Sequence, residues 1–315
     1  MNGRIVVLTG GVGGAKLVLG LAQIVPPGRI TAIVNTGDDF RHLGLAISPD
    51  IDTLLYTLSA KANAAQGWGR EGETWSFMAA LRSLEGADWF QLGDGDLALH
   101  VLRTAALAAG QPLSAITAGF AQGWKIGVQV LPMTDQPVAT YVATDAGELA
   151  FQDYFVARRC APVVSSIRFE GAVQARPAPG VLEAILDPET AAILIAPSNP
   201  YLSVDPILAV PGIAAALASA TAPVIAVSPI VGGDSVKGPT AKLMRELNIA
   251  ITPRSIATHY ANILDGLVVD GRDPPGALGI AFATVDTLMQ SLKDRVRVAR
   301  AALDLAQQVS RSFAR

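Results

Sequence analysis

Short apolar runs recur along the chain, and most of them are followed by glycine-rich or polar segments. The runs with the length and composition of strands are residues 4–8, 30–34, 191–195, 223–227 and 267–270. Such runs are typical of strands that are buried on both faces, as in a parallel sheet. Segments with helical spacing of apolar residues separate several of these runs. The pattern therefore predicts an α/β fold with a mostly parallel sheet flanked by helices.

The middle of the chain has a different pattern. Residues 126–144 alternate as strands do, with a break at residues 132–135, and another β-rich stretch begins at Phe151. A proline-rich segment over residues 176–180 separates this part from the strands that follow. We therefore expect a single domain over residues 1–315, with a Rossmann-like core of residues 1–45 and 190–315 and a smaller α+β lobe inserted over residues 46–180.

The last helix carries apolar side chains along one face. The residues of this stripe are Leu292, Val296, Ala299, Leu303, Ala306 and Val309. An amphipathic helix buries its apolar face against a partner. Together with the low fraction of charged residues, the stripe predicts a homodimer.

Composition and charge exclude several classes of protein. Half of the 315 residues are hydrophobic, 16% are charged, and the net charge is −3, so no basic field for nucleic acid is expected. The single cysteine, Cys160, cannot form an internal disulfide and is typical of a reducing compartment. No apolar run reaches membrane-spanning length, and the amino terminus lacks the unbroken apolar core of a signal peptide. We expect a cytoplasmic protein with no membrane partner.

A glycine-rich loop follows the first strand and precedes a helix. It contains Gly11, Gly13, Gly14 and Lys16. Glycines allow backbone N–H groups to approach an anion at a helix start, so the layout favours a phosphate or nucleotide loop. The P-loop fingerprint does not fit, because Ala15 and Leu17 flank Lys16 where glycine and serine or threonine are needed. The dinucleotide fingerprint does not fit either, because Lys16 stands where its third glycine belongs and Asn35 stands where a ribose-binding acid is usual. A tight turn that packs the first helix on the sheet is the alternative.

Six carboxylates follow strands or begin helices. They are Asp38, Asp39, Asp50, Asp52, Asp94 and Asp96. Ser48 and Pro49 suit the N-cap and the first position of a helix that contains two of them. Loops at the carboxyl ends of strands form the ligand sites of open α/β sheets, so we expect these carboxylates to converge. Carboxylates that gather in this way require a cation or a cationic substrate among them.

A segment rich in glycine, charge and aromatic side chains lies between these clusters, from Trp68 to Trp75. Its rings and the guanidinium of Arg70 suit a planar heterocycle, although a solvated loop is an equal alternative. Farther along, His100 and Arg103 lie three residues apart on one face of a predicted helix. A histidine in that position is more often structural than catalytic.

Two later strands end in side chains and backbone groups that donate hydrogen bonds. The first is followed by Ser198 and Asn199, and the second by Ser228, Gly232 and Gly233, with Lys237 before the next helix. Such groups are suited to binding phosphoryl oxygens.

The motifs taken together resemble those of the CofD family, the 2-phospho-L-lactate transferases of coenzyme F-420 biosynthesis. The resemblance covers residues from about 5 to 290 and rests on the segments at residues 10–16, 34–39, 47–53, 69–75, 92–98, 132–135, 196–200 and 226–244. Two positions depart from the family pattern. Gly95 stands where relatives often carry a basic residue, and Leu99 stands where threonine commonly precedes the histidine.

The resemblance implies a transfer that depends on Mg²⁺. The terminal ribityl hydroxyl of the deazaflavin Fo would attack the diphosphate of a guanylylated C3 acid, with release of GMP and formation of a phosphodiester. It implies that Asp50, Asp94 and Asp96 hold the metal or contact the attacking hydroxyl. The residues expected to bind the substrates are Gly11, Gly13, Gly14, Lys16, Asn35, Asp38, Asp39, Asp52, Arg70, Thr134, Asp135, Ser198, Asn199, Ser228, Gly232, Gly233 and Lys237.

Two other classes of protein are weighed against this one. A regulatory nucleotide-sugar-binding protein resembling the YvcK family would share the glycine loop but lack the paired aspartates at residues 50–52 and 94–96. An NAD-dependent oxidoreductase is disfavoured by Lys16 and Asn35. The sequence leaves open whether the transferred acid is lactate, enolpyruvate or glycerate.

Overall fold

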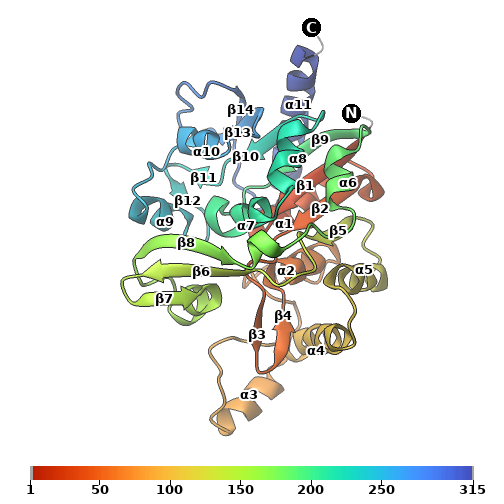
Figure 1. The fold of residues 1–315 in the computed structure, drawn as a ribbon, viewed down its shortest axis with the longest axis vertical. Helices are drawn as coiled ribbons and strands as arrows, with labels where there is room; N and C mark the ends of the chain where they lie inside the picture. The colour runs from red at the N-terminus through yellow and green to blue at the C-terminus, as the bar shows by residue number, and fades with distance from the viewer. Residues whose placement is uncertain (1–2, 314–315) are drawn as a thin grey trace.

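A parallel sheet of seven strands forms the centre of the part of the chain that this computed structural model describes, residues 3–313 (Figure 1). From one edge to the other, its strands are β14 (Ala281–Val285), β13 (Gly266–Asp270), β10 (Val224–Val227), β9 (Thr190–Ile195), β1 (Arg4–Thr9), β2 (Ile30–Val34) and β5 (Gln129–Pro132). Every pair of neighbours is parallel. Counted along the chain within this sheet, the order is 3-2-1-4-5-6-7, which extends the Rossmann order by one strand. The predicted α/β class is confirmed.

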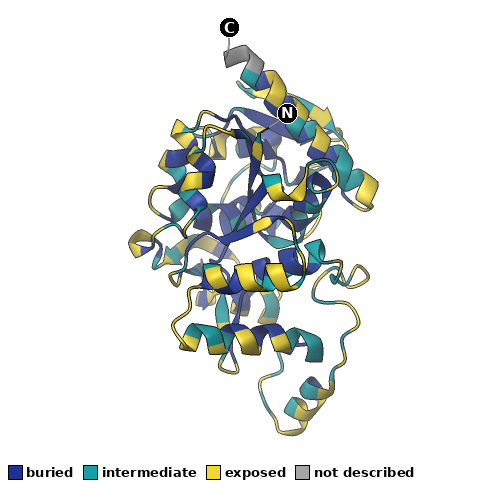
Figure 2. Cartoon of the chain, turned by 90° about the vertical axis from the view of Figure 1, so that its right-hand side faces the viewer, coloured by how far each residue is buried: buried dark blue, intermediate teal, exposed yellow. Residues whose placement is uncertain are grey.

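Helices cover both faces of the sheet because successive side chains of each strand point to opposite sides. In β1, Ile5 and Val7 belong to one core, whereas Val6 and Leu8 belong to the other. The first core includes side chains of α1 (Gly11–Leu21), α2 (Pro49–Leu58), α5 (Leu113–Gly123) and α11 (Leu292–Phe313). The second includes side chains of α6 (Val181–Leu186), α7 (Asp205–Ala209), α8 (Ile213–Ser219), α9 (Thr240–Glu246) and α10 (Pro253–His259). Figure 2 shows the buried strands between helices that expose only their outer faces.

Smaller elements extend from the loops of this body. They are the hairpin β3 (Phe40–His42) and β4 (Leu45–Ile47), helices α3 (Ser76–Ser83) and α4 (Asp94–Ala108), the antiparallel sheet β6 (Ala139–Thr144), β7 (Gly147–Ala150) and β8 (Val164–Glu170), and the hairpin β11 (Ile230–Val231) and β12 (Asp234–Ser235). Short 3₁₀ or π turns cover Pro27–Arg29, Asp153–Ala157, Ala172–Gln174 and Pro200–Val204. In Figure 1, α3 lies farthest from the sheet at the bottom of the view, and β6–β8 lie to the lower left.

Part of the segment expected to form the inserted lobe, residues 46–180, belongs to the main sheet and its helices. Strand β5 pairs with β2 in the main sheet, from Thr31 opposite Gln129 to Val34 opposite Pro132. Helix α2 packs on α1, and α5 packs on β5. The reason is that Val130 and Leu131 bury their side chains in the cores on opposite faces of the sheet, so β5 forms an edge strand of the main sheet rather than part of a peripheral hairpin. The break at Pro132–Asp135 is the end of this strand.

The apolar stripe of the last helix has its partner within the chain. Ala299, Ala306 and Val309 of the predicted stripe are buried in the core that contains α1, together with Val298, Ala302 and Leu305 of the same helix. Leu292, by contrast, is 47% exposed. The stripe therefore no longer supports the predicted homodimer.

No helix within residues 3–313 is by itself long and apolar enough to cross a membrane. One bent pair of segments, Pro200–Ala209 and Ile213–Ser219, reaches that length and composition. Ile207 and Ile213 of this pair are fully buried in the core beside the sheet.

Candidate active site

The direction in which strands are added reverses between β1 and β9, so the carboxyl ends of these two strands form the switch point of the sheet. From β1 the chain proceeds to β2 and β5 on one side, and it returns to β9 on the other. Ligands of open α/β sheets bind at such a switch point. Here the two loops are joined, because the N–H of Gly10 donates to Ser198 Oγ at 3.1 Å and Ser198 Oγ donates to the Gly10 carbonyl at 2.7 Å. The glycine loop and the loop after β9 are therefore in direct contact.

Asp50 lies directly against the glycine loop. Its Oδ1 accepts the N–H of Gly11 at 2.6 Å, and its Oδ2 accepts Asn35 Nδ2 at 3.0 Å. The same Nδ2 lies 3.3 Å from Asp38 Oδ1, and Asn35 Oδ1 accepts the N–H of Gly37 at 2.8 Å. Asn35 is fully buried and links two carboxylates that follow β2 and begin α2.

Asp39 completes what we call the acidic centre, namely Asp38, Asp39 and Asp50. Ser48 is at the N-cap position of α2, as predicted, but its hydroxyl donates to Asp39 Oδ2 at 2.6 Å. Among the described residues it makes no side-chain cap bond with the helix. The other oxygen of Asp39, Oδ1, is buried and has no hydrogen-bond partner within residues 3–313.

The environment of the acidic centre disfavours ionised carboxylates. Burial raises the pKa of Asp50 to about 6, although the hydrogen bonds from Asn35 and Gly11 act in the opposite direction. Burial also raises the pKa of Asp38 well above its usual value, and the charges of Asp50 and Asp39 add to this effect. The three carboxylates thus lie close together in a buried place, and one of their oxygens, Asp39 Oδ1, has no partner within residues 3–313.

The glycines of the loop are required by close packing. A Cβ on Gly10 would lie 2.5 Å from Asp50 Oδ2, and a Cβ on Gly13 would lie 2.8 Å from the Pro197 carbonyl. A Cβ on Gly14 would lie 2.8 Å from Ser198 Oγ. Gly13 and Gly14 thus fit the tight-turn interpretation, in which the loop packs the first helix against β9. The N–H of Gly11 binds a protein carboxylate rather than an open anion site.

Lys16 binds the loop between β14 and α11. Its Nζ donates to the carbonyl of Met289 at 2.8 Å, and burial lowers its pKa, as do the charges of Arg295 and Lys237. Lys16 therefore lies within electrostatic reach of Lys237, the other lysine expected to bind phosphate.

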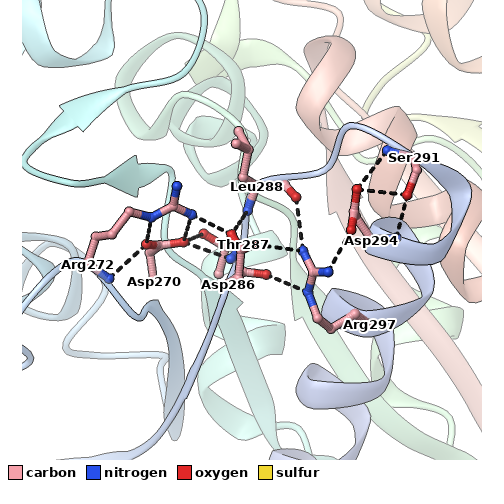
Figure 3. A network of polar contacts seen from close by, with 8 residues as sticks. All are labelled: Asp270, Arg272, Asp286, Thr287, Leu288, Ser291, Asp294 and Arg297. Carbon is pink, nitrogen blue, oxygen red and sulfur yellow. Dashed lines mark hydrogen bonds and ion pairs between the residues drawn. The ribbon is translucent and has the colours of Figure 1, made fainter.

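A polar network holds the loop that carries Met289 (Figure 3). Asp270, at the end of β13, is completely buried and accepts Arg272 Nε at 2.6 Å and both the N–H and the hydroxyl of Thr287, at 2.7 and 2.9 Å. Burial alone would raise the pKa of Asp270, but the hydrogen bonds from Arg272 and Thr287 hold it well below its usual value. Arg297 donates to the carbonyl of Leu288 at 3.1 Å. The network fixes the backbone that receives Lys16.

Asp94 does not join the acidic centre, contrary to the expected metal set. Its carboxylate accepts Thr74 Oγ1 at 2.5 Å and the N–H groups of Ser76 and Phe77 at 3.1 and 3.0 Å, which caps the start of α3. These bonds, the first of them above all, lower the pKa of Asp94. Within residues 3–313, no group of three or more His, Cys, Asp or Glu side chains is arranged to hold one metal ion.

Asp96 and Asp52 are also engaged by protein groups. Asp96 accepts the hydroxyl of Tyr56, and its Oδ2 lies 3.1 Å from His100 Nε2. Asp52 forms a buried ion pair with Arg103, whose Nη1 lies 3.1 Å from Asp52 Oδ2. The expected substrate contact of Asp52 is therefore not supported.

Thr134 and Asp135, which follow β5 and are expected to bind substrate, also accept hydrogen bonds from protein groups. Asp135 accepts the N–H and the hydroxyl of Ser114, at 2.6 and 2.9 Å, and thereby caps α5. Thr134 is fully buried and accepts the N–H of Gln136 at 3.1 Å. Asn199 caps the Pro200–Val204 turn through its Oδ1, while its buried Nδ2 has no partner among the described residues.

The glycine turn between β11 and β12 binds Asp273, a residue that the sequence patterns did not indicate. The N–H groups of Gly232 and Gly233 donate to the carboxylate of Asp273 at 2.9 and 2.6 Å, and Ser228 Oγ accepts the N–H of Ile230 at 3.2 Å. Both glycines have positive φ, which points their N–H groups toward one carboxylate. Asp273 is 5% exposed and about forty residues away in the chain, so no local pattern indicates the contact.

The aromatic segment lies beside Lys237 and the start of α4. The Nζ of Lys237 occupies the space where a Cβ of Gly67 would be, next to Trp68, which is 50% exposed. Arg70 Nη1 lies 3.1 Å from Glu73 Oε1, and Glu73 Oε2 accepts the N–H of Gly95 at 2.6 Å.

The contact between Arg70 and Gly95 explains one of the family departures noted above. A side chain at position 95 would collide with the guanidinium of Arg70. Arg70 would therefore have to take another position if residue 95 carried a side chain.

Comparison with known proteins gives consistent results. The family model described as "2-phospho-L-lactate transferase CofD" matches residues 5–300. The chain is 44% identical over 317 residues to a phosphoenolpyruvate transferase of Streptomyces coelicolor, covering 97% of this chain and 99% of that protein. It is 39% identical to the phosphoenolpyruvate transferase of Nocardia farcinica, with 96% and 95% covered, and 37% identical to that of Mycolicibacterium smegmatis, with 96% and 98% covered.

Among solved structures, a UPF0052-family protein from Bacillus halodurans is similar. Its crystal structure gives a TM-score of 0.66 at 18% identity, covering 96% of this chain and 99% of that chain. At this identity the likeness concerns the fold alone.

Proposed function

The chain belongs to the CofD family of 2-phospho-L-lactate transferases, and we propose that the acid it transfers is enolpyruvate. It is a phosphoenolpyruvate or phospholactate transferase of coenzyme F-420 biosynthesis. One observation supports the enolpyruvyl donor over the lactyl and glyceryl ones. The three relatives compared above share 37–44% identity over nearly their whole length, and each is named a phosphoenolpyruvate transferase.

In the proposed reaction, the terminal ribityl hydroxyl of Fo attacks the phosphorus that carries the enolpyruvyl group. The bond from that phosphorus to the bridging oxygen breaks, GMP leaves with the electron pair, and the hydroxyl proton is released. The product is a phosphodiester between Fo and enolpyruvate. Chemistry of this type depends on positioning the two reactants and on neutralising charge that develops in the transition state.

We propose that Asp38 and Asp50 hold Mg²⁺, with Asp39 nearby. Mg²⁺ in phosphoryl-transfer sites commonly takes one or two carboxylates together with phosphate oxygens of the substrate, so three protein carboxylates are not required. The buried carboxylates with raised pKa and the orphaned oxygen of Asp39 support this assignment. When bound, the ion would neutralise negative charge on the diphosphate. Asp94 does not fit, because the start of α3 already uses both of its oxygens.

Asp96 is our proposed partner for the attacking hydroxyl. Burial raises its pKa, but the contact with His100 and the hydrogen bond from Tyr56 outweigh burial and lower the pKa below its usual value. Its side chain is 15% exposed, and it lies one residue from the Gly95–Arg70 contact, beside the aromatic segment. Arg70 and Trp68 are the groups we assign to the deazaflavin side.

Lys237 and Lys16 are assigned to the donor side. Replacing Lys237 with alanine should weaken GMP binding by about 1.5–3 kcal/mol, since a charge-assisted contact with phosphate is lost. Isothermal titration calorimetry with GMP measures this directly. Lys293→Ala, at an exposed position of α11, is the matched control. Unchanged GMP affinity in Lys237→Ala would remove this lysine from the site.

Dependence of GMP release on Fo tests the proposed function. Purified protein with the guanylyl enolpyruvyl donor and Mg²⁺ should release GMP only when Fo is present. GMP release at the same rate without Fo would indicate a hydrolase instead.

We also propose a homodimer, which the low fraction of charged residues, 16%, favours. Sedimentation velocity at micromolar concentration should give a mass near twice the 32.7 kDa of one chain. A single species of monomer mass would exclude the dimer at that concentration.

A further inference from the structure

A buried chain of polar side chains links α2 to α4 beneath the acidic centre. Arg103 is only 1% exposed, and its guanidinium pairs with both oxygens of Asp52. Its Nη1 also donates to the carbonyl of Ala46 at 3.3 Å. These bonds fix the position of the Arg103 guanidinium between α4 and the start of α2.

The same Nη1 lies 3.3 Å from His100 Nδ1. A guanidinium has donors only, so a hydrogen bond between these two groups requires Nδ1 as the acceptor, and a neutral imidazole then carries its proton on Nε2. Asp52 Oδ2 lies 3.7 Å from Nδ1, which is too long for a hydrogen bond that would reverse the tautomer. Arg103 therefore sets the direction in which His100 donates.

The donating nitrogen faces the carboxylate that the mechanism uses. His100 Nε2 lies 3.1 Å from Asp96 Oδ2, while Asp96 Oδ1 accepts the hydroxyl of Tyr56. The hydroxyl of Tyr56 holds one oxygen of the carboxylate, and the His100 imidazole lies in ion-pair contact with the other, although Nε2 makes no hydrogen bond within residues 3–313. The partial exposure of the Asp96 side chain leaves it accessible from one side.

We propose that His100, oriented by Arg103, is a positioning residue that holds Asp96 toward the attacking hydroxyl, and that Tyr56 fixes the second oxygen. The proposal rests on the role given to Asp96 under the proposed function. A group that orients another catalytic group, rather than touching the substrate, affects the rate of the bound complex more than substrate binding.

The tautomer of His100 can be observed without any turnover. The chain has only three histidines, His42, His100 and His259, so their imidazole ¹⁵N signals can be assigned by substitution. Long-range ¹H–¹⁵N spectra of the wild-type protein should show His100 neutral with the proton on Nε2. A proton on Nδ1 would overturn the proposal, whatever the activity of the protein.

Variants at position 100 test the positioning role. His100→Leu should lower kcat roughly 10- to 100-fold, with the KM for the guanylyl donor changed by less than about twofold. His100→Gln, whose amide can donate from nearly the same place, should recover most of the loss. A His100→Leu protein with lowered Tm but wild-type kcat would show a purely structural residue and overturn the proposal.

A second variant covers the case in which His100→Leu does not fold. Tyr56→Phe keeps the ring against Trp124 and removes only the hydroxyl, and it should also lower kcat without raising the donor KM. Wild-type kcat in Tyr56→Phe together with an Nδ1–H tautomer of His100 would overturn the proposal. Inactive wild-type protein would instead contradict the proposed function, so the two failures are distinguishable.

Discussion

Replacing Asp50 with asparagine is expected to lower kcat for transfer to Fo by roughly 100-fold or more. Asparagine keeps the shape of the side chain and can still accept the N–H of Gly11, but it removes one of the charges that would hold Mg²⁺. The fold should be retained, because a buried carboxylate close to Asp38 is neutralised. Steady-state rates and the Tm of the two proteins measure both effects.

Asp94→Asn is the matched control. Asp94 caps α3 in the structure, and asparagine is itself a good capping residue, so this variant should retain most of its activity. Raising the Mg²⁺ concentration should restore part of the rate of Asp50→Asn. If Asp94→Asn were the inactive variant and Asp50→Asn the active one, the acidic centre would be assigned to the wrong carboxylates.

The metal-free protein should lose stability as the pH rises through the acidic centre. Asp50 has a folded pKa of about 6 against a usual value of 3.8, so the native state binds more protons than the unfolded chain between these values. The free energy of unfolding therefore falls with rising pH in this window, by about 3 kcal/mol for a shift of two units. Asp38 and Asp39 act in the same direction.

Excess Mg²⁺ should cancel most of this loss. The ion binds ionised carboxylates, so it should raise the free energy of unfolding at about pH 8 and have little effect at about pH 5. Asp270 and Asp96 have lowered pKa values and contribute in the opposite sense, but only below about pH 4. Denaturant unfolding at both pH values, with EDTA and with Mg²⁺, checks the prediction. Equal Mg²⁺ effects at the two pH values would show that the ion binds elsewhere.

Much of the fold could be predicted from local patterns. The runs at residues 4–8 and 191–195 are apolar on both faces, and a strand of that kind fits only inside a parallel sheet. Pro49 and the preceding Ser48 correctly place the start of α2, since proline suits the first turn and cannot lie deeper in a helix.

The partners of polar side chains could not be predicted in the same way. An aspartate after a strand or at a helix start has the same local pattern whether it binds a metal or caps a neighbouring helix. Asp94 and Asp135 proved to be caps for α3 and α5, whereas Asp50 faces Gly11. Which of these occurs depends on contacts between segments distant in sequence.

Distant contacts also decided two other features. The apolar stripe of α11 packs against α1 and the sheet. The periodicity of the sequence shows that the stripe is buried but not whether its partner belongs to the same chain or to a second subunit. The N–H groups of Gly232 and Gly233 appeared to be free for phosphate, but Asp273 accepts both.

The most direct test of the central claim is the mass of the product formed from Fo. The wild-type protein, given Fo, Mg²⁺ and an equal mixture of the guanylyl donors of enolpyruvate, lactate and glycerate, should form chiefly the Fo phosphodiester of enolpyruvate, together with GMP. Mass spectrometry distinguishes the three possible products. A product carrying mainly lactate or glycerate would contradict the proposed donor, and the absence of any phosphodiester of Fo would contradict the function itself.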